Sequence, residues 1–79
     1  MATFEVTATW GDPITLSQRE IFQVQTGRLV YIAFGATPPA HALDGAVIRD
    51  EQLLILEPGQ TVQFRTRSGT ATVYRGAFA

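Results

Sequence analysis

The last third of the chain alternates apolar and polar residues in runs that turn-forming residues keep short. Val62 and Phe64 alternate with polar neighbours, the pair Ser68-Gly69 interrupts the run, and Ala71 and Val73 resume it. A period of two places these four apolar residues on one face of a pair of strands. Such a face must be covered by another layer, so the pattern predicts a β-hairpin that packs against the rest of the protein.

The predicted loop at Ser68-Gly69 also fixes a register. As a two-residue hairpin loop, it places Phe64 opposite Val73 and Thr66 opposite Ala71. The outer face of this hairpin then carries polar and aromatic side chains, namely Gln63, Arg65, Arg67, Thr70, Thr72 and Tyr74.

Similar short runs fill the rest of the chain. Residues 3–10 alternate from Phe4 to Trp10 and predict a half-buried strand, which ends where Pro13 cannot donate to a ladder. Pro58-Gly59 predicts a type II turn, because glycine accepts a positive φ at the third position. Further segments are predicted as a short strand or edge over 14–17, an irregular proline loop over 35–45, and two strands or one bulged strand over 46–51 and 52–56.

A second hairpin is predicted over residues 20–34, with Gly27 in its loop. One face would hold Phe22, Val24, Leu29, Tyr31 and Ala33, and the other Ile21, Val30, Ile32 and Phe34. Its second strand is apolar on both sides, so it is either covered twice within one chain or buried by another chain. We therefore take Val30, Ile32 and Phe34 as candidate residues of an oligomer interface.

The predicted fold is all-β: one domain, 1–79, forming a small antiparallel β-sandwich or barrel of six to eight short strands. A chain of 79 residues buries a small core, and this one has no cysteine for disulfides and one histidine, too few for a metal cage. Oligomerisation is the remaining source of stability.

The composition argues against several classes of function. Six arginines against seven acids leave a net charge of −1, without the basic excess of a nucleic-acid-binding protein. No lysine is present for a Schiff base, a carrier domain or a phosphate loop. No apolar segment is long enough to span a membrane, and the first residues do not form a secretory signal, so we expect synthesis in the cytoplasm and no membrane partner.

No set of residues predicts catalysis, a cofactor or a metal site. His41 near Asp44 lacks a nucleophile, and Asp44, Asp50 and Glu51 do not match the spacing of a calcium loop, so solvated side chains explain both groups better. Trp10 is interpreted as a lid over the core, with an aromatic of a binding site as the alternative. Phe78, near the end of the sequence, suggests docking on the sandwich or on a neighbour.

Arg65, Arg67 and Tyr74 should share the outer face of the last hairpin, with Arg65 diagonal to Tyr74. Such a face could be plain surface, a subunit interface, or an arginine–aromatic platform for sugars or peptides. We keep all three alternatives at this stage and add these residues to the candidate interface.

The order of turns and strands over residues 20–75 resembles small structural proteins of tailed bacteriophages. The segments that carry the resemblance are Gln25-Thr26-Gly27, Val30 to Gly35 followed by Thr37-Pro38-Pro39, Leu54 to Gln60, and Gly69 to Tyr74. The resemblance implies a virion component, most simply a trimeric capsid decoration protein that binds itself and the major capsid protein or another virion protein. A tail or head–tail component is an alternative within this class.

Two rival functions come from other classes. A carbohydrate- or peptide-binding module would use Arg65, Arg67 and Tyr74. A cupin-like enzyme would need a cluster of histidine and carboxylate ligands, which one histidine does not supply. The sequence therefore predicts a non-enzymatic structural protein located in the virion.

Overall fold

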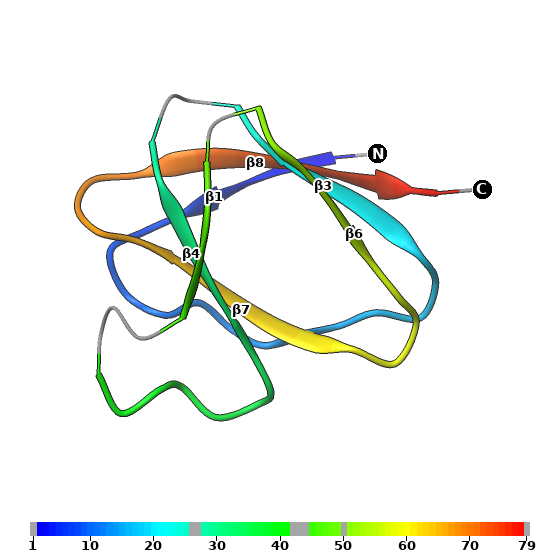
Figure 1. Cartoon of the computed structure of the whole chain (residues 1–79), viewed down its shortest axis with the longest axis horizontal. Helices are drawn as coiled ribbons and strands as arrows, with labels where there is room; N and C mark the ends of the chain where they lie inside the picture. The colour runs from blue at the N-terminus through cyan, green and yellow to red at the C-terminus, as the bar shows by residue number, and fades with distance from the viewer. Residues whose placement is uncertain (1, 26–27, 42–44, 50, 79) are drawn as a thin grey trace.

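The computed structural model describes residues 2–25, 28–41, 45–49 and 51–78, which form β-strands and no helix (Figure 1). The predicted all-β class is therefore confirmed. The eight strands of the described residues are β1 (Ala2–Val6), β2 (Ile14–Thr15), β3 (Glu20–Val24), β4 (Val30–Phe34), β5 (Ala46–Ile48), β6 (Leu53–Leu56), β7 (Thr61–Thr66) and β8 (Ala71–Ala77).

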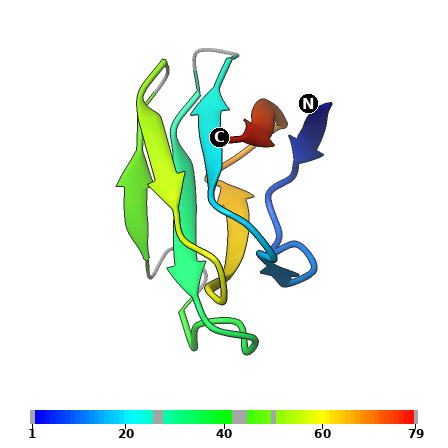
Figure 2. The same cartoon turned by 90° about the vertical axis from the view of Figure 1, so that its right-hand side faces the viewer.

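The strands form two four-stranded antiparallel sheets that pack face to face (Figure 2). The β8 sheet has the order β1-β8-β3-β6, and the β7 sheet has the order β2-β7-β4-β5. Strands β5 and β6 form the edges on one side of the sandwich, and β1 and β2 form the edges on the other (Figure 2). The architecture is the predicted sandwich.

The core lies between the two sheets and is almost entirely apolar. The four residues singled out in the last third, Val62, Phe64, Ala71 and Val73, are at most 4% exposed. The other buried apolar residues are Val6, Leu16, Phe22, Val24, Val30, Ile32, Ile48 and Leu56. The period-two pattern thus predicted the inward face of β7 and β8 correctly.

Both predicted hairpins are wrong, because the chain changes sheet at each connection. Strands β7 and β8 lie in different sheets, as do β3 and β4. In the observed registers Phe64 pairs with Ile32, and Val73 pairs with Phe4 and Val24. The physical reason is burial: in a hairpin the apolar faces of β7 and β8 would lie side by side, whereas in the sandwich they cover one another.

The crossing between β3 and β4 also changes which side of β4 is inside. Val30 and Ile32 are 0% and 3% exposed and face the core together with Phe22 and Val24, while Leu29 is 38% exposed. The predicted grouping of Leu29 with Phe22 and Val24 is therefore wrong. Gly27, the predicted loop residue, lies outside the described residues.

The first strand is shorter than predicted because the chain switches sheets after Val6. The Thr66 N–H donates to the Thr7 carbonyl oxygen at 2.8 Å, and the Gly11 N–H donates to the Phe64 carbonyl oxygen at 3.0 Å. Residues 7–11 therefore follow β7, and β2 continues along it. One end of this segment belongs to the β8 sheet and the other to the β7 sheet.

The predicted turn at Pro58-Gly59 is confirmed. Gly59 has a φ of 88°, the positive value that the third position of a type II turn requires, and the Gln60 N–H donates to the Glu57 carbonyl oxygen at 3.3 Å. The described part of the proline loop, residues 35–41 and 45, contains no strand, as predicted.

The connection between β7 and β8 is held by a buried hydroxyl group. Thr66 is 0% exposed, and its Oγ1 donates to the Gly69 carbonyl oxygen at 2.6 Å. Thr66→Val keeps the shape and removes the donor, so we expect a loss of about 1 kcal/mol in the free energy of unfolding, measured in urea. Thr66→Ser, which keeps the hydroxyl, should lose less. Equal losses in the two variants would contradict this role.

Candidate functional site

The outer face of the β8 sheet carries a group of neighbouring apolar side chains that are left uncovered. Leu53, Ile55 and Phe78 are 60%, 48% and 41% exposed. In the registers of β3, Ile21 pairs with Ile55 on one side and with Gly76 on the other. We call the set Ile21, Leu53, Ile55 and Phe78 the β6 surface.

Strand β8 contributes a flat area beside this surface. Gly76 is buried although it lies on the outer side of the sheet, because the side chain of Tyr74 covers it. A Cβ atom on Gly76 would lie only 2.6 Å from the Tyr74 hydroxyl oxygen. The glycine therefore allows the tyrosine ring to lie along the sheet, as aromatic residues do over glycines in strands.

Strand β6 is also an unprotected edge. One of its sides pairs with β3, and the other side has no neighbouring strand in the described sheet. Its sequence, Leu53-Leu54-Ile55-Leu56, contains none of the charged residues or prolines that usually block pairing at an edge. The unpaired backbone N–H and C=O groups of this edge therefore lie directly beside the apolar side chains of the β6 surface.

A charged pair borders this region. The Arg19 Nε donates to the Glu57 Oε1 at 2.9 Å, and both side chains are about half exposed. The Arg19 guanidinium also lies 5.9 Å from the centre of the Phe78 ring, and the Phe78 N–H donates to the Arg19 carbonyl oxygen. An apolar centre with a polar border is the usual composition of a protein interface.

The structure changes the set of predicted interface residues. Val30 and Ile32 belong to the protein's own core, so including them in an interface was wrong. The sequence of β4 is apolar at successive positions, so it does not show which side of the strand is buried. Phe34, at the end of the same strand, is 57% exposed, and Phe78 is 41% exposed, so both remain available to a partner.

Arg65 and Tyr74 do not share a face, so the predicted platform is absent. Arg65 lies on β7 and pairs with Tyr31, whereas Tyr74 lies on β8 in the opposite sheet. The aromatic partner of Arg65 is Trp10, whose ring centre is 6.0 Å from the guanidinium. Arg67 follows β7 and is exposed.

Trp10 acts as a lid, although not over the core. Its ring is near Arg65 on β7 and reaches Gly45, where an added Cβ would lie 3.3 Å from the ring edge and 2.7 Å from the Ile32 carbonyl oxygen. The ring therefore spans β7 and β4 on the outer face of the β7 sheet. Its Nε1 is buried and has no hydrogen-bond partner among the described residues.

A buried ion pair, which the sequence analysis missed, closes one end of the core. The Arg75 Nε and Nη2 donate to the two carboxylate oxygens of Glu20 at 2.8 and 2.7 Å. The Glu20 side chain is 8% exposed and the Arg75 side chain 30%. These hydrogen bonds hold the pKa of the Glu20 carboxyl below its usual value against the opposing effect of burial, and they raise the pKa of Arg75.

The structure gives no support for a catalytic or metal-binding role of the histidine and acidic residues considered in the sequence. His41 is exposed, and Asp44 and Asp50 lie outside the described residues. Glu51 has a φ of 65°, and its N–H donates to the Val24 carbonyl oxygen. Within the described part of the chain, no three histidine or acidic side chains are placed to hold a metal ion. No helix of that part is long and apolar enough to cross a membrane.

Comparison with known proteins adds no relative. The chain matches no protein-family model, no curated protein and no solved structure.

The ion pair makes the stability depend on pH. Because the folded-state pKa of Glu20 is lowered, the pair stabilises the fold above the usual carboxyl pKa, near 4.5, and this contribution is lost as the pH falls through the folded-state pKa. Glu20→Gln should therefore lower the free energy of unfolding by about 2 kcal/mol at pH ~7, a value reduced from that of fully buried pairs because Arg75 is partly hydrated. At acid pH, below the folded-state pKa of Glu20, the difference between wild type and variant should vanish.

Glu57→Gln is the matched control, because it removes the carboxylate of an exposed ion pair. It should change the free energy of unfolding by less than about 0.5 kcal/mol at either pH. A Glu20→Gln effect that is the same at both pH values would show that packing, and not the charge, is responsible.

Proposed function

We propose that this protein is a non-enzymatic structural protein that assembles with copies of itself through the β6 surface. The observation that carries the proposal is the uncovered apolar region of Leu53, Ile55 and Phe78 beside the unprotected edge of β6. Soluble single-chain proteins seldom leave such a region without a partner. A small sandwich without disulfides gains the most from such a partner.

The size of the gain limits how strongly two copies can associate. Complete burial of a leucine, isoleucine or phenylalanine side chain contributes about 1.5–3 kcal/mol. With exposures of 60%, 48% and 41%, the three side chains offer roughly 3 kcal/mol per copy. Association costs at least about 4 kcal/mol, so side-chain burial between two copies leaves a small surplus. Backbone pairing at the β6 edge, or attachment to a surface that holds many copies, must supply the rest.

Because burial of these side chains only slightly exceeds the cost of association, the protein is better suited to bind a surface that holds many copies. We therefore propose a bacteriophage virion protein, specifically a trimeric capsid decoration protein in which the β6 surfaces of three copies meet. Of the turn pattern over residues 20–75 that suggested this class, the Pro58-Gly59 turn is present, whereas the two predicted hairpins are absent, so the assignment is supported by that turn and by the need for a partner surface. A near-zero net charge also supports it, because many copies can then lie close together without strong repulsion.

The rival carbohydrate- or peptide-binding module has no support from the geometry. Its platform required Arg65 and Tyr74 on one surface, and these residues lie on opposite sheets. A tail or head–tail position remains compatible with the β6 surface, since it requires the same kind of assembly.

The assembly is tested by placing charges on the β6 surface. In the double variant Leu53→Glu/Ile55→Glu, two carboxylates would have to be buried at the interface, which is strongly unfavourable. We expect the wild type to form oligomers as its concentration rises from ~5 to ~500 µM, and the variant to stay monomeric, as measured by analytical ultracentrifugation. The thermal unfolding of the two monomers should be similar, because both positions are exposed.

Val47→Glu is the control for added charge, because Val47 is 43% exposed but lies on β5 in the other sheet. This variant should associate like the wild type. A wild-type protein that is monomeric at ~500 µM would contradict assembly through the β6 surface.

The virion assignment is tested separately. Phage particles released from the organism that carries the gene should contain the protein in many copies, as measured by quantitative mass spectrometry of purified particles. Absence from such particles would refute the virion role, while leaving the self-assembly result unaffected.

A further inference from the structure

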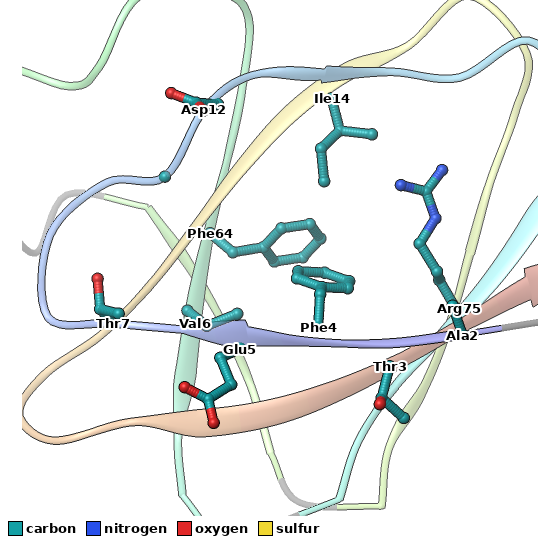
Figure 3. Close-up of a pocket in the computed structure, with 11 residues that line it drawn as sticks. Ala2, Thr3, Phe4, Glu5, Val6, Thr7, Asp12, Ile14, Phe64 and Arg75 are labelled. Atoms are coloured by element: carbon teal, nitrogen blue, oxygen red, sulfur yellow. The ribbon is translucent and has the colours of Figure 1, made fainter.

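The sandwich opens into a cleft on the side away from β6. The cleft lies between β1 and the segment around Ile14, has a volume of about 310 Å³, and is lined by both apolar and polar side chains (Figure 3). It lies where the chain passes from β1 in the β8 sheet to residues 7–11 beside β7. Its volume is at the lower end of the range for small-molecule sites.

Aromatic rings form the inner wall of the cleft. The ring centres of Phe4 and Phe64 are 5.7 Å apart, and each ring also packs against Phe22, at 6.3 and 5.5 Å. Phe22 and Phe64 are at most 4% exposed, whereas Phe4 is only partly buried and faces the opening. The wall is therefore apolar and held in place by the core.

Arg75 supplies a cation at one end of this wall. Glu20 binds the guanidinium through Nε and Nη2, which is its side-on edge. The end-on edge, formed by Nη1 and the second hydrogen of Nη2, has no hydrogen-bond partner among the described residues. The guanidinium also lies 5.4 Å from the centre of the Phe22 ring, so its orientation is fixed from two sides. Figure 3 shows the Arg75 side chain reaching alongside the cleft, with its guanidinium near Ile14.

The acidic residues of the lining do not occupy this free edge. In Figure 3 the carboxylates of Glu5 and Asp12 point away from the rings and from Arg75. Glu5 pairs with Thr72 and lies on the outer side of β1. The interior of the cleft therefore offers one unused set of donors above an apolar wall.

We propose that this cleft binds a small organic carboxylate whose body is aromatic or branched aliphatic. The ligand's carboxylate would accept two hydrogen bonds from the end-on edge of Arg75, the geometry in which guanidinium recognises carboxylates. Its apolar body would cover Phe4 and lie against Phe64 and Ile14. Since Glu20 already balances the charge of Arg75, directed hydrogen bonds and apolar burial provide the affinity, which should be in the range of ~0.1–1 mM.

Phenylacetate is the probe, and phenylacetamide is its neutral analogue of the same shape. In a titration followed by nuclear magnetic resonance, phenylacetate should shift the backbone amides of Phe4, Val6 and Ile14 and the side-chain Nε signal of Arg75. The amide analogue should bind about tenfold more weakly, because it cannot accept a charge-assisted bidentate pair. Equal affinities for the two compounds, or shifts that map to another surface, would overturn the proposal.

Two variants test separately what the Arg75 guanidinium and the cleft each contribute to binding. Arg75→Gln alone would leave Glu20 buried without its partner, so the test uses Glu20→Gln/Arg75→Gln, in which two amides replace the pair. This variant should lose phenylacetate binding at least tenfold, whereas Arg65→Gln, which removes a guanidinium from the outer face of the β7 sheet, should bind normally. Undiminished binding by the double variant would overturn the proposal.

A second variant covers the case in which the first does not fold. Ile14→Phe fills the cleft from its partly buried wall and leaves Arg75 unchanged, so it should weaken phenylacetate and phenylacetamide alike. Unchanged affinity in this variant would place the ligand elsewhere and overturn the proposal. Binding does not require assembly, because β1 and β6 are opposite edges of the β8 sheet.

Discussion

The fold depends on burying the inward face of each strand against the opposite sheet instead of beside its neighbour in sequence. Strands β3 and β4, and likewise β7 and β8, are consecutive in sequence and lie in different sheets. These crossings bring Val62 and Phe64 on β7 to the same interior as Ala71 and Val73 on β8. Because neither sheet can hide its apolar face alone, the two sheets form together, and every other feature of the molecule follows from how their edges are closed.

This dependence explains how far the sequence could predict the fold. Alternation in β7 and β8 predicted which side chains are buried, because a period of two fixes the side of the strand to which each residue belongs. It could not predict the partner strand, since residues 67–70 can connect either two neighbours in one sheet or two strands in facing sheets. In β4, Tyr31 and Ile32 are both compatible with a core position, so alternation did not show which side of the strand faces the core. The error at Val30 and Ile32 followed from that ambiguity.

The candidate site, too, has features that the local sequence shows and features that depend on how the strands pair. Leu53 and Ile55 were visible as an apolar run, but their exposure depends on β6 being an edge, which only the strand order reveals. The pair of Glu20 and Arg75 joins residues 55 positions apart, so no local motif marks it. One signal was present: Arg75 continues the inward series of Ala71 and Val73, and Glu20 continues that of Phe22 and Val24. Two opposite charges at inward positions of apolar strands are expected to pair with one another.

A buried ion pair is weak evidence for stability, because apolar residues of similar volume often stabilise a core at least as well. The position of the pair explains why charged residues are found there better than its contribution to stability does. Arg75 lies where the sheets separate, so a long apolar side chain there would be partly exposed, while a guanidinium can pack on Phe22, bind Glu20 and keep its end in contact with water. The two edges of the β8 sheet are thus closed by different means. Beside β1 the core ends at an open cleft next to Arg75 of β8, whereas β6 leaves an apolar face that another molecule can cover.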